Sequence, residues 1–220
     1  NLGEPTANPY IQPVFSDFFS HYFSANFVET EDADILISGT VNTRAVSDMP
    51  NEWGLYQVFG DLTISISNGN ILVIAWERKT NAEAIQAGRQ NISGEFWPVE
   101  IVEIQPSGST GGSVVWEWHS WDHLCQDVNS SKDNYYADGC DNHPELIDIN
   151  VGNTSGGGGD WIHANGMDYD PILDRIVFSS HEMDEIYVID RSTTTAEAAS
   201  HIGGNSSQGG DILYRWGRPA

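Results

Sequence analysis

Short runs of apolar residues, separated by glycine, asparagine and aspartate, recur along the chain in two matching series. Each series has two runs around a tight turn, a third run of the form Glu-Ile-x-x-Ile, and a fourth run that ends in tryptophan. Apolar runs of this length between turn-forming residues predict β-strands. The predicted strands lie in 61–76, 99–104 and 113–118 for the first series and in 165–180, 184–189 and 211–216 for the second.

Repeated four-stranded units predict an all-β fold in which the units stack as blades of a β-propeller. Closed propellers have roughly four to eight blades, and one blade cannot cover both of its faces alone. Because the sequence shows about two full blades, we expect either that this chain is part of a larger propeller or that it completes itself by self-association. An unusual two-bladed fold is the alternative.

The segments between the predicted strands suggest how the chain is organised. The expected parts are an N-terminal segment that could belong to a blade (1–50), a first blade (51–118), an inserted polar loop (119–160) and a second blade (161–220). Within the N-terminal segment, Ile35-Leu-Ile37 is the best candidate strand. Helix-forming residues at 78–88 end in glycine and predict a short helix inside the first blade, and 192–199 forms a comparable insertion in the second.

The chain is strongly acidic, with 32 aspartate and glutamate residues against 9 lysine and arginine residues and a net charge of −23. Such a charge repels nucleic-acid backbones and anionic membranes, so neither is an expected partner. No apolar run is long enough to cross a bilayer. The acidity and the start of the sequence, which resembles a processed mature form, favour a secreted, periplasmic or cell-surface protein.

The two cysteines, Cys125 and Cys140, bracket the polar loop. In an exported protein, such a pair is most simply a disulfide that staples the loop, although two free thiols or half of a metal site would use the same residues.

The same loop offers the best candidate for calcium. Oxygen-bearing residues alternate there as in an EF-hand loop, but Lys132 stands where that loop needs glycine, and the last acid is shorter than the usual glutamate. The candidate ligands are Asp127, Asn129, Ser131, Asp133 and Asp138. Calcium is the one cofactor that the sequence suggests.

Histidine is the other chemistry-bearing residue type. His119 and His123 follow the end of a predicted strand, whereas His163 precedes one and His181 ends one. With Asn165 two residues after His163, the pair could share one strand face. Histidine can relay protons, bind metal or stabilise an anion; for any one of these residues a structural, hydrogen-bonded role is the alternative. The seven histidines are His21, His119, His123, His143, His163, His181 and His201.

Several other chemistries lack their sequence signals. There is no Cys-x-x-Cys, and the His119/His123 spacing falls after a strand rather than on a helix, so zinc is not predicted there. There is no Gly-x-Ser-x-Gly elbow for a serine hydrolase, and no phosphate loop or dinucleotide fingerprint.

Four segments give the chain a resemblance to the arylsulfotransferase family, the aryl-sulfate sulfotransferases that work without phosphoadenosine phosphosulfate. The segments are Ser67–Thr80, Val115–Leu124, Asp160–Asn165 and Gly210–Gly217, and the resemblance covers roughly residues 50–220. It implies an exported, six-bladed propeller that moves a sulfuryl group from a phenolic sulfate donor to a phenol acceptor through a sulfated histidine.

The resemblance also implies roles for particular residues. His163 and Asn165 match a His-x-Asn pair that contacts the sulfuryl oxygens, and His181 stands where the family has arginine. Imidazole is cationic only part of the time near neutral pH, which weakens the anion clamp. A further family histidine is replaced by Phe59, just before Gly60-Asp61, and the nucleophilic histidine would belong to a later blade.

Two functions therefore follow from the sequence. The first is an arylsulfotransferase-like enzyme with His163, Asn165 and His181 in the catalytic site. The second is a propeller without catalysis that serves as a structural, surface-assembly or ligand-binding protein, which the changes at Phe59 and His181 favour.

Overall fold

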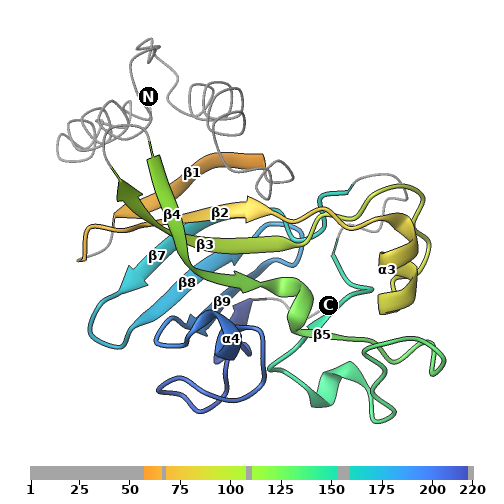
Figure 1. Cartoon of the computed structure of the whole chain (residues 1–220). Helices are drawn as coiled ribbons and strands as arrows, with labels where there is room; N and C mark the ends of the chain where they lie inside the picture. Colours follow the sequence, from red (N-terminus) through yellow and green to blue (C-terminus); the bar gives the residue numbers. More distant parts are fainter. Residues whose placement is uncertain (1–56, 66–67, 108–110, 153–158, 218–220) are drawn as a thin grey trace, which may run out of the picture.

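The computed structural model describes residues 57–65, 68–107, 111–152 and 159–217, and these residues form two four-stranded antiparallel sheets (Figure 1). The first sheet has the order β1 (Gln57–Ser65), β2 (Ile71–Trp76), β3 (Val99–Ser107) and β4 (Gly111–His119). The second runs in the order β7 (Ala164–Asp170), β8 (Arg175–Ser180), β9 (Glu185–Asp190) and β10 (Tyr214–Gly217). The predicted all-β class is confirmed, and each predicted strand has its counterpart. The candidate strand at Ile35-Leu-Ile37 and the rest of 1–50 lie outside the described residues.

The two sheets lie against one another with β1 beside β7, and they share one hydrophobic core. Leu72 and Ile74 enter this core from the first sheet, and Phe178 and Tyr187 enter it from the second. In β8 buried and partly exposed residues alternate, as expected of a strand with one covered face. In β2 both faces are buried, which explains its continuous apolar run.

Two tryptophans of β4 connect the first sheet to the segment that joins β9 to β10. The indole N–H of Trp116 donates to Thr193 Oγ1 at 3.1 Å, and that of Trp118 donates to the Gly210 carbonyl at 2.7 Å. Both side chains are fully buried, so each indole N–H needs such a partner. The corresponding tryptophan of the second series, Trp216 on β10, is 65% exposed.

Short helices with the same start signal follow β2 and β9. In α3 (Asn81–Ala87) and α4 (Thr195–Ala198), a threonine caps the first turn and a glutamate three residues later bonds back to it. The helix expected within 78–88 is thereby confirmed, and it ends at Gly88, whose φ of 104° suits glycine.

The connection between the two sheets is more structured than a polar loop. It contains the turns η2 (Ser120–Asp122) and η3 (Cys140–Asn142), and β5 (Leu124–Cys125) pairs in parallel with β6 (Ile147–Asp148). Leu124, Ile147 and Ile149 are buried in the main core. This strand pair was not predicted from the sequence, because strands of two residues are too short to show a period.

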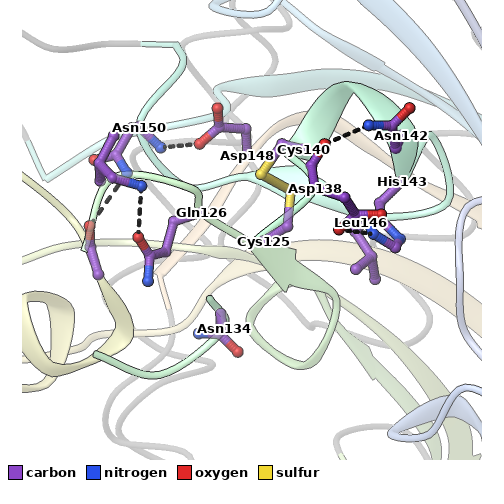
Figure 2. Close-up of a disulfide and its surroundings, with 12 residues drawn as sticks. Cys125, Gln126, Asn134, Asp138, Cys140, Asn142, His143, Leu146, Asp148 and Asn150 are labelled. Carbon is purple, nitrogen blue, oxygen red and sulfur yellow. Dashed lines mark hydrogen bonds and ion pairs between the residues drawn. A yellow bond between two sulfur atoms is a disulfide. The ribbon is translucent and has the colours of Figure 1, made fainter. Parts of the chain in front are cut away.

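The predicted disulfide between Cys125 and Cys140 is confirmed (Figure 2). It ties the end of β5 to the start of η3, across the polar part of the connection. Among the described residues, no helix has the length and apolar character needed to cross a bilayer.

Candidate functional site

His163 and His181 lie next to each other where β7 begins and β8 ends. The antiparallel pairing of Ala164 with Ser180 brings the residues just outside the two strands together. The two imidazole rings are 5.4 Å apart between centroids, and the His181 backbone N–H donates to the His163 carbonyl at 3.1 Å. Two residues that the sequence analysis assigned to one site are therefore neighbours.

Asn165 lies at an irregularity of the same strand pair. The register shifts between Ala164 and Gly166, which leaves Asn165 as the extra residue of a β-bulge. Its side chain is exposed, and its Oδ1 accepts a hydrogen bond from Ser179 Oγ at 2.9 Å. The expected two-residue alternation between His163 and Asn165 is interrupted here, so their spacing alone does not place both on one face. The amide nitrogen of Asn165 remains the group that can donate to an anion.

The His163 ring is oriented by an acid three residues earlier. Its Nδ1 hydrogen-bonds the carboxylate of Asp160, and His163 has a φ of 49°, in the left-handed region. Burial raises the pKa of Asp160, although the contact with His163 opposes that shift. With Nδ1 engaged, Nε2 is the nitrogen that can face a ligand, and 47% of the side chain is exposed.

A second carboxylate lies beside His181. The His181 Nδ1 is 3.1 Å from an oxygen of Glu182, and its side chain is 64% exposed. Each of the two histidines thus has an acidic partner, Asp160 or Glu182. The negative charge of these partners offsets part of the attraction that the site has for an anionic ligand.

His119 belongs to a different group, which is rich in carboxylates. Its Nδ1 is 3.3 Å from Glu77, and its Nε2 is 3.7 Å from Glu100 and 3.6 Å from Glu117. Burial raises the pKa of Glu100 to about 8. Burial alone would lower the pKa of His119, but the contacts with Glu117 and Glu77 outweigh it and raise the pKa to about 10. Near neutral pH the group therefore holds an imidazolium beside a protonated Glu100.

His123 takes part in a third arrangement. It is fully buried, its Nδ1 is 2.8 Å from Asp211 Oδ1, and its Nε2 is 2.8 Å from the Ala198 carbonyl. His201 Nδ1 approaches the same Asp211 oxygen at 2.7 Å. Nothing in the sequence indicates that these residues meet, because Asp211 follows His123 by 88 positions.

Three of the five candidate calcium ligands, Asn129, Asp133 and Asp138, already contact hydrogen-bond donors of the protein. Asn129 Oδ1 accepts from the Ser131 backbone and hydroxyl, and Asp133 Oδ1 accepts from Gln86 at 3.0 Å. Asp138 lies 3.1 Å from His143 Nε2, and this contact lowers the pKa of Asp138 (Figure 2). Calcium binding by this loop stays a prediction.

Two four-stranded antiparallel sheets match the all-β class that the resemblance to arylsulfotransferases led us to expect. The sequence model of the arylsulfotransferase (ASST) family matches residues 18–198, and the chain belongs to this family. No curated protein and no solved structure matched the chain.

Proposed function

We propose that this protein transfers a sulfuryl group from a phenolic sulfate to a phenol. The observation that carries the proposal is the adjacency of His163 and His181, with ring centroids 5.4 Å apart, in a chain of the arylsulfotransferase family. Both rings are exposed enough to meet a ligand. In this proposal the phenolic sulfate and the phenol are the two substrates, and no cofactor is needed.

The proposed role of this site is to hold the oxygens of the transferred group. Charge spreads over the equatorial oxygens during sulfuryl transfer, much as in phosphoryl transfer, so donors already in place stabilise the transition state. His163 would donate from Nε2, since Asp160 engages Nδ1. Asn165 would donate from its amide nitrogen, and His181 would contribute positive charge when it is protonated.

The nucleophile in this proposal is a histidine from another part of the protein. A covalent sulfo-histidine divides the transfer into two easier steps. In the first step, the imidazole nitrogen attacks sulfur and the S–O bond to the donor phenol breaks, releasing a phenolate that takes up a proton. In the second, the acceptor phenol loses its proton as its oxygen attacks sulfur, and the S–N bond breaks.

The proposed scaffold is a β-propeller, six-bladed by family resemblance, of which the two described sheets are neighbouring blades. The shared core and the contact of β1 with β7 support this arrangement, because the first strands of propeller blades line a common axis. Export to the periplasm, the cell surface or the medium is part of the proposal. The Cys125–Cys140 disulfide supports it, since disulfides persist in oxidising compartments.

A second candidate function is a non-catalytic structural, surface-assembly or ligand-binding protein. The specific observation in its favour is the presence of Asp160 and Glu182 beside the two histidines, where they repel an anionic substrate. The replacement of family residues by Phe59 and His181 points the same way.

A transfer assay separates these functions. The full-length protein is given an aryl sulfate whose phenol is chromogenic, together with a phenol acceptor, and sulfated acceptor is measured. We expect turnover in the wild type and a loss of roughly 100-fold or more in His163→Ala, since a lost oxyanion donor has an effect of that size.

His143→Ala is the matched control, because His143 also contacts two carboxylates, Asp138 and Glu145, but lies at the end of η3, just after Cys140. It should keep wild-type turnover. An inactive wild-type protein that is folded would leave the non-catalytic function, and equal losses in both variants would remove His163 from the site.

A further inference from the structure

Three potential metal ligands converge where the segment after β4 meets the segment between β9 and β10. One ligand atom from each of His123, His201 and Asp211 lies within 4.8 Å of the other two. We propose that these residues bind a divalent transition-metal ion of the zinc type. This proposal is independent of the sulfuryl-transfer proposal, because none of the three residues belongs to the His163–His181 site.

The two histidines present the same nitrogen to the same oxygen. His123 Nδ1 is 2.8 Å and His201 Nδ1 is 2.7 Å from Asp211 Oδ1. The two rings are nearly perpendicular, with an interplanar angle of 87° and 5.8 Å between centroids. The three atoms therefore surround one point from different directions, as ligands of a single ion do.

The far side of the His123 ring is fixed as in a metal-bound histidine. His123 Nε2 lies 2.8 Å from the Ala198 carbonyl, which can only accept, so the ring proton belongs on Nε2. Nδ1, on the opposite side of the ring, faces Asp211 and is the nitrogen that can ligate an ion. A metal-bound histidine usually donates its other ring N–H to a carboxylate or a backbone carbonyl, as His123 does to Ala198.

The surroundings hold the buried ligand rigidly and leave one side open. His123 is fully buried and stacks on Trp118, with ring planes 3° apart. The Asp211 side chain is 8% exposed, whereas that of His201 is 56% exposed. An ion can therefore enter from the His201 side and complete its coordination with water there, in the way that a three-ligand zinc site does.

A glycine permits the close approach of the two segments. A Cβ atom at Gly210 would lie 2.0 Å from the Ala198 carbonyl oxygen and 2.7 Å from His123 Nε2. Any side chain at this position would thus displace His123 or the carbonyl that orients it.

The donor set selects the class of ion. Two imidazoles and one carboxylate suit zinc and similar ions, whereas calcium and magnesium take oxygen ligands almost entirely. Tetrahedral bonds of about 2.0–2.1 Å would place the ligand atoms roughly 3.3 Å apart. The present separations of 2.7 and 2.8 Å need to open by only about half an ångström.

The experiment uses the full-length protein after removal of metal with a chelator. Zinc chloride is titrated by calorimetry, and cobalt(II) absorption reports nitrogen ligands and tetrahedral geometry. We expect one zinc ion per chain and a rise in melting temperature on binding, because an ion that binds only the folded state stabilises it. His201→Ala, at an exposed position, should fold and should weaken zinc binding at least tenfold, and Asp211→Asn should have a similar effect.

His143→Ala is again the matched control and should bind zinc as the wild type does. The proposal is overturned if the folded wild-type protein binds no zinc, or if His201→Ala and Asp211→Asn both bind as tightly as the wild type. It is also overturned if only His143→Ala loses binding, since the ion would then lie beside η3 and not at His123. Activity plays no part in these readouts, so failure of the transfer assay leaves them unaffected.

Discussion

Glu100 and His119 are direct cross-strand partners on β3 and β4, with 3.7 Å between Glu100 Oε1 and His119 Nε2. Within the described part of the chain, neither carboxylate oxygen of Glu100 has a hydrogen-bond partner. A buried carboxyl without donors is held in its neutral form, whereas the neighbouring imidazole, with several carboxylates around it, is held in its charged form. This pair makes the stability of the protein depend on pH.

Both pKa values are higher in the folded protein than the reference values of 4.5 for Glu100 and 6.5 for His119. The folded state therefore binds protons that the unfolded state has released, and stability falls as pH rises. The contribution of Glu100 is lost between pH 4.5 and about 8, and that of His119 between 6.5 and about 10. Urea unfolding should show the steepest decline between pH 6.5 and 8, at up to about 1.4 kcal/mol per pH unit for each proton.

Glu100→Gln tests the assignment of this pH dependence. The amide keeps the shape of the protonated acid but does not titrate, so the decline below pH 8 should become shallower. His143→Ala, which leaves the β3–β4 pair intact, should keep the wild-type profile. A wild-type profile that is flat between pH 6 and 8 would contradict the assignment.

The disulfide should contribute substantially to stability. Cys125 and Cys140 are 15 residues apart, and closing a loop of this size lowers the entropy of the unfolded chain by an amount equivalent to about 3 kcal/mol. The double variant Cys125→Ser/Cys140→Ser should lose about this much in urea unfolding. Reductant should destabilise the wild type to a similar level and leave the double variant unchanged; reductant that acts equally on both would refute the explanation.

The indole of Trp118 should matter far more than that of Trp216. Trp118→Phe removes the donor to the Gly210 carbonyl inside the core and reduces the packed volume, so we expect a loss of about 2–3 kcal/mol. Trp216 is 65% exposed, so Trp216→Phe should change the free energy of unfolding by no more than about 0.5 kcal/mol. Equal losses of stability in the two variants would contradict the difference in burial between Trp118 on β4 and Trp216 on β10.

The substitution at His181 yields a prediction about activity, which rests on the proposed function. A guanidinium stays cationic at every working pH and can hold two oxygens at once, whereas imidazole does neither. His181→Arg is readily accommodated because the side chain is 64% exposed. It should raise kcat/KM for aryl-sulfate transfer roughly tenfold. His181→Gln, which carries no charge, should give no such increase.

The strands were predictable because their signal is local. The apolar runs of β2 and β9 and the turns beside them are legible in a few consecutive residues, and the pairing of His163 with His181 follows once β7 and β8 are known to be antiparallel. The disulfide was predictable because the chain has only two cysteines.

What the sequence did not reveal depends on contacts between distant segments. Leu124 and Ile147 lie in short apolar stretches of a polar connection, and their burial depends on the pairing of β5 with β6. The approach of His123 to Asp211 spans 88 positions and depends on Trp118 and Gly210, which no local period indicates.

The bulge at Asn165 is likewise a property of the strand pair, since it exists only as a shift of one strand against the other.

The unequal surroundings of Trp118 and Trp216 make the outer strands of the two sheets different. The outer strand of the first sheet is capped by the second, whereas the outer strand of the second presents Tyr214 and Trp216 to its surroundings, 59% and 65% exposed. The two described sheets therefore differ at their outer strands: the tryptophan of β4 is covered by the segment between β9 and β10, whereas β10 keeps two aromatic side chains accessible.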